Sequence, residues 1–308
     1  MKILHFSKIK KVDEGTVVGI GKFDGVHLGH QKILGIVSAE AKKKGRVAGV
    51  ITFRNFPVEF LLCRWEEKLS LIKRAGIELC IWSDFDEISQ LSPERFLEIL
   101  LEAGVKTIVV GYNFRFGKDR KGDIKFLKNK AKGQGFSLVI VPPYKKNGEI
   151  VSASNIRRLI KSGNVYKANK LLGRYFSVSG KVVRGKGIGK EMGFPTANLS
   201  LENNISIGEG VYAGWTLYNK NVYKSAIVIG HSPTFNDNTK KFEVFLIDFG
   251  KRKNLYNKQM LVFLYKKLRR QIKFNDKEQL KRHIEKDIKK IKSLLRQHIP
   301  LLKLLFKR

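Results

Sequence analysis

Two histidines, His27 and His30, stand three residues apart just after the β-branched run Thr16–Ile20 and a glycine-containing turn. A helix that begins at this point would carry both rings on one face of its first turn. Its N-terminus would also present unpaired N–H groups and the positive end of the helix dipole, which bind phosphate. A lone histidine is most often a surface or core residue, but this spacing, with Gly29 between the rings, favours a functional pair. We expect both rings to donate hydrogen bonds where charge develops on a phosphate.

The segment Arg184–Asn198 is rich in glycine and ends in Pro-Thr-Ala-Asn. Closely spaced glycines let the backbone approach a ligand and turn its N–H groups inward, as a phosphate-holding loop requires. The P-loop pattern is excluded, because no glycine stands five positions before Gly189 and the residue two after it is glutamate. A flexible turn is the alternative, but a turn needs no hydroxyl and amide two residues apart after a proline. Thr196 and Asn198 could therefore coordinate Mg²⁺ and the phosphate oxygens of a nucleotide.

A carboxylate, Glu243, lies within the otherwise apolar run Phe242–Ile247. A carboxylate is costly in such surroundings unless it has a chemical task or a partner. A structural ion pair and a catalytic base are the two explanations that the run itself leaves open.

Alternating strand-like and helix-like stretches make up the first half of the chain. The sequence predicts short strands at 16–20, 46–53, 106–111 and 136–141, and helices over about 27–44 and 154–172. Ser92 followed by Pro93 predicts a further helix start, because serine caps a helix and proline fits its first position. Strands separated by helices predict a parallel sheet that is covered on both faces.

The pattern of predicted elements changes after Gly173, from alternating strands and helices to successive strands. Strand-like runs at 176–183, 211–218, 222–229, 242–249 and 260–265 are typical of an antiparallel barrel or sandwich. A last helix is predicted from about Asp276. We expect its one apolar face to pack on the barrel or sandwich, and this face is formed by Leu280, Ile284, Ile288, Ile291 and Leu295. The expected fold class is α/β plus β: a domain with a parallel sheet over residues 1–172, and an antiparallel barrel or sandwich with a C-terminal helix over 173–308.

The composition is that of an ordinary globular protein, with 308 residues of which 43% are hydrophobic and 10% aromatic. Cys63 and Cys80 are too few for a disulfide framework, which suits a reducing cytoplasm. The first residues show no apolar run or small-residue cleavage site typical of a secretory leader. No stretch approaches the roughly 18 apolar residues of a membrane helix. We therefore expect a cytoplasmic protein without a membrane span.

The formal net charge is +34, from 61 basic and 27 acidic residues. Such an excess attracts polyanions, so nucleic-acid binding is an alternative function. No zinc-finger spacing, RNA-recognition signature or heptad-bearing basic region accompanies the charge, and nucleotide substrates are anions as well. We expect no specific nucleic-acid partner, and the sequence does not indicate an oligomeric state.

The glycine-rich segment resembles the G-x-x-x-G-R-x-x-G-F-P-T-A-N loop of riboflavin kinases. Ile20–Gln31 (IGKFDGVHLGHQ) resembles the nucleotide-binding signature of the FMN adenylyltransferase half that usually precedes this kinase in bacteria. Further family motifs are similar to segments 109–123, 151–157, 229–235 and 243–249, in the same order. The chain thus resembles the bifunctional riboflavin kinase/FMN adenylyltransferases.

This resemblance implies a Rossmann-like nucleotidyltransferase domain over residues 1–172, a small antiparallel Greek-key barrel over 173–308, and two successive reactions. Riboflavin would be phosphorylated to FMN by one ATP, and FMN would be adenylylated to FAD by a second ATP with release of pyrophosphate. Mg²⁺ is the implied metal, and the implied partners are the small molecules riboflavin, FMN and ATP.

In the first domain, the resemblance implies adenylyl transfer at His27 and His30. No covalent intermediate is needed, because the FMN phosphate can itself attack the α-phosphorus of ATP. Arg157 would reach the ATP phosphates through its guanidinium, which suits phosphate oxygens. Ser152 and Ser154 would bind phosphate or only cap a helix. Other implied phosphate contacts are Gly21, Phe23, Asp24 and Gly29, and the implied flavin contacts are Asn113, Arg115 and Phe116.

In the second domain, the resemblance makes Glu243 the base of the kinase reaction, with Thr196 and Asn198 as ligands of Mg²⁺ and phosphate. Lys190 occupies the place of a usual arginine, which keeps the charge but loses the planar fork. The loop would be shaped by Gly185, Gly187, Gly189 and Gly193. The implied flavin contacts are Phe194 and Arg269, with Pro233 and Phe235 as pocket walls or ordinary core residues.

Some positions depart from the family pattern. Asn113 stands where aspartate is common, which removes a charge that favours Mg²⁺. The segment Arg54–Pro57 stands where Pro-His-Pro is common, and Ala153 and Ser154 replace a serine and a threonine. A riboflavin kinase with a silent adenylyltransferase half is therefore one alternative. A flavin- or nucleic-acid-binding regulator is the other, and Glu243 with the Pro-Thr-Ala-Asn loop opposes it.

Overall fold

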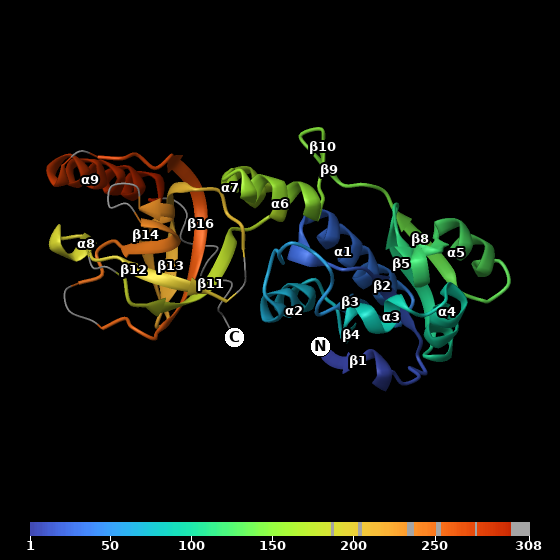
Figure 1. The fold of residues 1–308 in the computed structure, drawn as a ribbon. Helices are drawn as coiled ribbons and strands as arrows, with labels where there is room; N and C mark the ends of the chain where they lie inside the picture. The colour runs from blue at the N-terminus through green and yellow to red at the C-terminus, as the bar shows by residue number, and fades with distance from the viewer. Residues whose placement is uncertain (186–187, 203–204, 233–236, 251–253, 275, 297–308) are drawn as a thin grey trace. The chain divides into compact units, whose positions relative to one another are not determined.

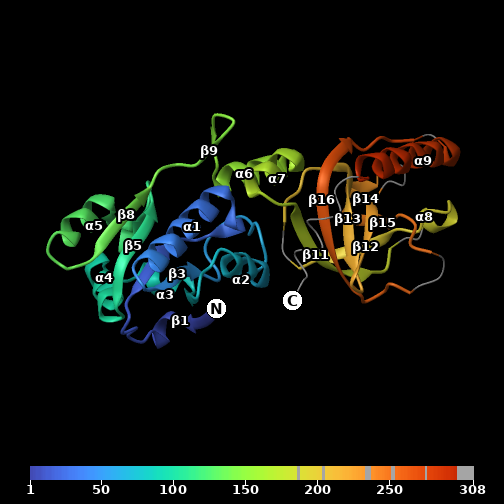
Figure 2. The same cartoon turned by 180° about the vertical axis from the view of Figure 1, so that it is seen from behind.

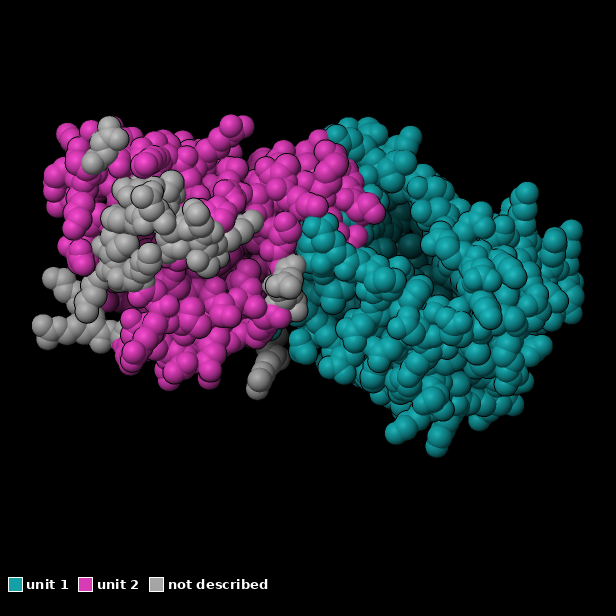
Figure 3. Space-filling view, viewed as in Figure 1, with its two compact units in different colours: residues 1–153 teal, residues 154–308 magenta. Residues whose placement is uncertain are grey.

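The computed structural model describes residues 1–185, 188–202, 205–232, 237–250, 254–274 and 276–296. The chain divides into two compact units, Met1–Ala153 and Ser154–Arg308, which are teal and magenta in Figure 3. None of the described helices is long and apolar enough to cross a membrane.

A six-stranded sheet forms the centre of the first unit, with the strand order β1-β4-β3-β2-β5-β8 (Figure 1). Every pair of neighbouring strands in it is parallel, as the alternation of strands and helices predicted. The strands are β1 (Lys2–His5), β2 (Thr16–Ile20), β3 (Val47–Phe53), β4 (Leu79–Ser83), β5 (Val105–Gly111) and β8 (Ser137–Val141).

Helices cover both faces of this sheet, which explains the continuous apolar runs in its strands. Neighbouring residues of β2 point to opposite faces: Val17 packs with Leu34 on one side, and Val18 packs with Leu97 on the other. The helices are α1 (Leu28–Lys43), α2 (Trp65–Arg74), α3 (Phe85–Ser89), α4 (Pro93–Glu102) and α5 (Ile124–Ala131). Short elements of this unit are η1 (Phe6–Lys8), η2 (Asp24–Val26), β6 (Arg115–Phe116), η3 (Lys118–Arg120), β7 (Gly122–Asp123), β9 (Lys145–Lys146) and β10 (Glu149–Ile150).

The helix start predicted at Ser92 is confirmed. The Ser92 hydroxyl oxygen accepts a hydrogen bond of 3.1 Å from the backbone N–H of Arg95, and Pro93 is the first residue of α4. A capping oxygen satisfies one of the N–H groups that the first turn leaves unpaired.

The strand order reverses at β2, because the chain runs from β2 to β3 and β4 on one side and later adds β5 and β8 on the other. In an open parallel sheet, ligands bind outside the carboxyl ends of the strands at such a switch point. The loops that follow β2 and β5 therefore border one crevice. These loops carry the histidine pair and the segment around Asn113.

The second unit contains a closed antiparallel barrel with the strand order β11-β12-β15-β14-β13-β16 (Figures 1 and 2). All strands predicted after Gly173 are present, and Ala197–Leu201 adds a strand that the sequence did not predict. The strands are β11 (Phe176–Val183), β12 (Ala197–Leu201), β13 (Gly210–Tyr218), β14 (Asn221–Ser232), β15 (Asp237–Leu246) and β16 (Gln259–Arg269). The helices are α6 (Ala153–Lys161), α7 (Val165–Leu172), α8 (Ile188–Glu191) and α9 (Lys277–Leu294).

Helix α7 is tied to the barrel by the buried side chain of Asn169. Its amide nitrogen donates to the carbonyl oxygen of Leu264 at 2.8 Å, and its amide oxygen accepts from the backbone N–H of Phe176 at 2.7 Å. These bonds explain why α7 groups with the barrel rather than with the first unit. The domain boundary after residue 172 remains a prediction.

Helix α9 covers one outer face of the barrel, as its apolar face predicted. Ile291 and Leu295 are fully buried and pack with Trp215. The Asp276 carboxylate caps the helix by accepting a hydrogen bond of 2.7 Å from the backbone N–H of Gln279. The apolar tail over 299–308 lies outside the described residues.

Candidate functional site

His27 is the N-cap residue of α1. Its Nδ1 accepts a hydrogen bond of 3.3 Å from the backbone N–H of His30, and its side chain is buried. Because Nδ1 is the acceptor, a neutral His27 carries its proton on Nε2. The imidazole therefore replaces the usual serine or aspartate cap and keeps a fixed N–H donor at the helix N-terminus.

The two histidine rings stack on each other, with their centroids 3.6 Å apart and their planes at 18°. Gly29 makes this approach possible: an added Cβ would lie 3.2 Å from His27 Cε1 and 3.4 Å from the carbonyl oxygen of Val151. The structure thus brings both rings together at one helix end, where the backbone N–H groups bind anions.

The pKa of His30 lies well below its usual range. Burial is the main cause, and the charges of His27 and Lys68 lower the pKa further. His30 is therefore neutral at pH 7 and offers a neutral N–H donor. Its Nδ1 has no hydrogen-bond partner among the described residues, although the atom is buried.

Phe23 and Asp24 shape the turn between β2 and α1. Phe23 has a left-handed backbone with φ of +46° and packs its fully buried ring against His30, at a centroid distance of 5.3 Å. The Asp24 carboxylate accepts a hydrogen bond of 2.9 Å from the backbone N–H of Leu62. An added Cβ on Gly21 would lie 3.4 Å from the Phe23 ring. These contacts give Phe23 and Asp24 a structural role. Direct contact of either residue, or of Gly21, with phosphate remains a prediction.

The loop after β5 places Asn113 and Arg115 at the surface and Phe116 in the core. The Phe116 ring packs with three other phenylalanines at centroid distances of 5.4 to 5.8 Å, namely Phe96, Phe114 and Phe126. Helix α1 lies beside this loop, since an added Cβ on Gly111 would be 3.7 Å from Ile33 Cδ1 and 3.8 Å from Asn113 Oδ1. Asn113 and Arg115 are thus the accessible members of the predicted flavin-side set.

Ser152 directly precedes α6, and Ser154 and Arg157 lie in its first turns. Ser154 and Arg157 belong to the second unit, whereas the histidine pair belongs to the first. Their contact with ATP remains a prediction.

In the barrel, Asn198 and Glu243 lie directly opposite each other on the antiparallel strands β12 and β15. Directly paired residues point to the same face of a sheet, with Cβ atoms about 5 Å apart. Their neighbours Ala197 and Val244 form the next pair and are buried, whereas Asn198 and Glu243 are half-buried. The carboxylate and the carboxamide that the sequence places far apart therefore share one site.

The glycine-rich loop lies against this pair. An added Cβ on Gly185 would overlap the Asn198 carboxamide, and one on Gly189 would lie 2.5 Å from the Phe194 carbonyl oxygen and 3.4 Å from Thr196 Oγ1. The backbone N–H of Phe194 donates to Gly189 O at 2.8 Å, which closes the loop. Gly185 thus lies against Asn198, which is paired with Glu243, and Gly189 lies near Thr196.

Gly185→Ala should lower riboflavin phosphorylation on the order of 10²-fold, because the new methyl group displaces the Asn198 side chain and such misplacement is costly in an aligned site. Steady-state phosphorylation rates test this, with Gly133→Ala as a control because an added Cβ there contacts nothing within 4 Å. Adenylylation of added FMN should be unchanged in both variants. Equal phosphorylation by Gly185→Ala and wild type would contradict the assigned position of Asn198.

The other residues predicted for the kinase site have varied surroundings. The Phe194 ring packs edge-on against Phe245 at a centroid distance of 5.7 Å. Gly193 has φ of +85°, so the loop needs glycine there. Arg269 forms an ion pair with Asp287 of α9, with an Nη2–Oδ2 distance of 2.8 Å, so its contact with a flavin remains a prediction. Gly187, Pro233 and Phe235 lie outside the described residues, as does the side chain of Lys190.

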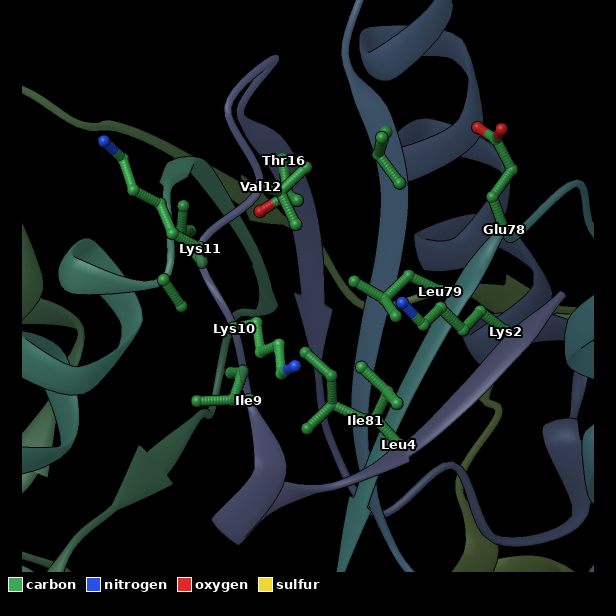
Figure 4. A pocket seen from close by; sticks show the side chains of 13 residues that line it. Lys2, Leu4, Ile9, Lys10, Lys11, Val12, Thr16, Glu78, Leu79 and Ile81 are labelled. Atoms are coloured by element: carbon green, nitrogen blue, oxygen red, sulfur yellow. The ribbon is translucent and has the colours of Figure 1, made fainter.

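A cavity of about 220 Å³ opens at the other end of the parallel sheet (Figure 4). Lys2 and Lys10 extend their ammonium groups over an apolar floor that includes Leu4 and Ile81. The cavity is also lined by the first residues of four strands, Thr16, Val47, Leu79 and Val105. It therefore lies at the amino ends of the strands, away from the histidine pair at their carboxyl ends.

One charged residue near the histidine pair was missed by the sequence analysis. Lys68 is 4% exposed and contributes to the low pKa of His30. In the sequence it is one lysine on an amphipathic helix, in a chain with 61 basic residues. No sequence pattern distinguishes it from the solvent-exposed lysines.

Comparisons with known proteins match both halves of the chain. The family model described as FAD synthetase matches residues 9–155, and the model described as riboflavin kinase matches residues 172–295. A protein named bifunctional riboflavin kinase/FMN adenylyltransferase from Buchnera aphidicola subsp. Schizaphis graminum is 36% identical over 95% of this chain and 98% of its own length. Proteins of the same name are 33% identical in Bacillus subtilis, over 93% of this chain and 96% of the relative, and 32% identical in Escherichia coli K12, over 89% and 91%.

A solved structure has a similar fold over most of the chain. It is described as a macrolide-efflux protein from Streptococcus pneumoniae, and it matches with a TM-score of 0.82 and 28% identity over 94% of this chain and 98% of its own. We take only the fold from this similarity. The family models and the relatives lead to one conclusion: the chain belongs to the bifunctional riboflavin kinase/FMN adenylyltransferase family.

Proposed function

We propose that this protein phosphorylates riboflavin to FMN in its barrel and adenylylates FMN to FAD at the histidine pair. The observation that supports the kinase most directly is the register pairing of Asn198 with Glu243 beside the glycine-rich loop. The stacked histidines at the N-terminus of α1 support adenylyl transfer in the same way.

In the kinase reaction, the Glu243 carboxylate accepts the proton of the primary alcohol of riboflavin. The alkoxide oxygen forms a bond to the γ-phosphorus of ATP as the bond to the ADP oxygen breaks. Phosphoryl transfer of this kind depends mostly on positioning and charge neutralisation. Thr196, Asn198 and the loop N–H groups provide these functions by holding the phosphate oxygens.

In adenylyl transfer, an oxygen of the FMN phosphate attacks the α-phosphorus of ATP, and the bond to pyrophosphate breaks. The Nε2–H of His27 and a neutral N–H of His30 donate to oxygens on which negative charge develops. Donors that are already in place lower the barrier because they need no reorganisation during the reaction. Arg157, Ser152, Ser154 and Asn113 complete the proposed set for ATP and FMN.

Enzymes of these families use ATP, generally with a divalent cation, and we propose Mg²⁺ for this one. The described residues contain no cluster of three or more His, Cys, Asp or Glu side chains that would form a metal site by themselves. The hydroxyl of Thr196 and the carboxamide of Asn198 are hard oxygen donors that fit Mg²⁺ when phosphates supply further ligands. The ion would neutralise phosphate charge during the phosphoryl transfer.

The charge and the cysteines fit this proposal. A net charge of +34 favours anionic substrates such as ATP and FMN, and we propose no specific nucleic-acid partner. Cys63 and Cys80 are both buried, and two cysteines are too few for a disulfide framework, which supports a reducing compartment such as the cytoplasm.

A time course with riboflavin, ATP and Mg²⁺, with the flavins separated by chromatography, tests the proposal. We expect FMN to rise first and then to fall as FAD accumulates. FMN without FAD would leave a riboflavin kinase with a silent first unit, and the absence of both products under several metal and redox conditions would refute the proposed function.

A further inference from the structure

Lys68 is a buried lysine on α2, in the same unit as the histidine pair. Its side chain is 4% exposed, and its Nζ donates a hydrogen bond of 2.7 Å to the carbonyl oxygen of Phe53. Phe53 is the last residue of β3, the strand beside β2. The ammonium group is therefore fixed at the carboxyl edge of the sheet, where the phosphates of the substrates are expected.

A second ammonium group, that of Lys22, lies near one of the aromatic rings around Lys68. Lys68 Nζ lies 5.5 Å from the centroid of the Trp65 ring and 5.6 Å from that of Phe56, and Lys22 Nζ lies 5.1 Å from the same Phe56 ring. Phe56 occupies the segment in which the family pattern has Pro-His-Pro. This chain thus places two lysines around an aromatic ring where a histidine is common.

Helix α2 packs against the turn η2, which leads directly into His27 (Figure 1). Burial is the main cause of the low pKa of His30, and the charges of His27 and then Lys68 lower this pKa further. Lys68 can therefore influence the reaction without contacting the substrate.

A purely structural lysine does not explain these surroundings well. A buried ammonium group is costly even when it is paired: Lys68 donates to a carbonyl oxygen, and the charge of Asp24 in η2 favours its protonated form. An apolar side chain would pack against Trp65 and Phe56 at a lower cost. A charge that persists in such a position suggests a use that depends on the charge.

We propose that Lys68 is a positioning residue for adenylyl transfer, whose buried ammonium group supplies fixed positive charge at the carboxyl edge of the sheet for the phosphates of ATP and FMN. This inference rests on the proposed adenylyltransferase activity. It assigns to Lys68 an electrostatic role and no covalent step or proton transfer.

The first test compares Lys68→Met, which removes the charge at similar volume, with Lys68→Arg, which keeps it. We expect Lys68→Met to lower kcat/KM for FMN adenylylation on the order of 10²-fold, as the loss of one electrostatic contribution to a transition state does. Lys68→Arg should recover most of this loss. Riboflavin phosphorylation by the same preparations should stay at the wild-type rate and serves as the folding control.

The pH profile separates an electrostatic role from a structural one. Burial lowers the pKa of Lys68 to about 8, while the charges of Cys63, Asp24 and Cys80 oppose this shift. The ammonium group is charged below this pH and neutral above it, so wild-type adenylylation should decline above pH about 8. Lys68→Arg should move this decline to higher pH, because a guanidinium group does not lose its proton in this range.

Other groups that face Lys68 must be excluded as the source of the decline. Burial raises the pKa of Cys80 to about 12, so this thiol does not titrate near pH 8. Cys63→Ser removes the other thiol whose charge acts on Lys68 and should leave the decline in place. His30 titrates on the acid side, and its pKa should rise in Lys68→Met, because a neighbouring positive charge no longer opposes protonation; ¹⁵N NMR of the ring reports this rise.

Three results would overturn the inference: wild-type FAD formation by Lys68→Met, equal losses in Lys68→Met and Lys68→Arg with an unchanged pH profile, or an unchanged His30 pKa in Lys68→Met. The second would show that Lys68 has a structural role. Failure of the wild-type protein to form FAD at all would instead refute the proposed function, so the two failures can be told apart.

Discussion

Glu243→Gln should abolish most riboflavin phosphorylation while adenylylation of added FMN continues at the wild-type rate. A carboxamide of the same shape cannot accept the proton of the substrate alcohol, and loss of a general base costs about 10²- to 10⁴-fold. Because the side chain is half-buried and paired across the strands with Asn198, the isosteric change preserves the register of β12 and β15. The loss should appear in kcat rather than in KM for ATP.

Glu285→Gln is the matched control for this prediction, because Glu285 is exposed on α9 in the same unit. It should phosphorylate riboflavin as the wild type does. A Glu243→Gln enzyme that kept more than about a tenth of the wild-type kcat would lie outside the range for a lost base, and the carboxylate would then be a structural partner.

The strand and helix pattern could be predicted because it depends on local sequence. Ser92 and Pro93 mark the start of α4, and apolar runs mark β2, β3, β5 and β8 in the first unit and most strands of the barrel, but β1 and β4 were not predicted. The strand β12 was missed because Ala-Asn-Leu-Ser-Leu contains no β-branched residue and the segment is ordered by its partners β11 and β15. Its formation depends on contacts that are distant in the sequence, which local propensity does not describe.

The candidate site also combines features that local sequence predicts with features that only the fold reveals. Residue types and spacing identified the histidine pair, the glycine-rich loop and Glu243 separately. The pairing of Asn198 with Glu243, the capping role of the His27 ring and the burial of Lys68 required the fold. Each depends on which residues of distant segments become neighbours, so no pattern within a single segment could reveal them.

His27→Asn should stop most FAD formation and leave FMN as the accumulating product. Asparagine caps a helix well, so the start of α1 should be retained, since its side-chain oxygen can accept from the backbone N–H of His30. The variant loses the Nε2–H donor, and removal of one such donor costs on the order of 10²- to 10³-fold in kcat. The rate of FMN adenylylation, monitored by the release of pyrophosphate, measures this loss directly.

His5→Asn provides a matched control, because His5 also caps a helical turn in the first unit, where its Nδ1 accepts from the backbone N–H of Ser7. This variant should form FAD normally. The pKa of His30 should rise in His27→Asn, since the charge of the neighbouring ring no longer lowers it. If His27→Asn instead formed FAD at the wild-type rate, the stacked pair would be a structural cap, and adenylyl transfer would have to depend on other donors at the carboxyl edge of the sheet.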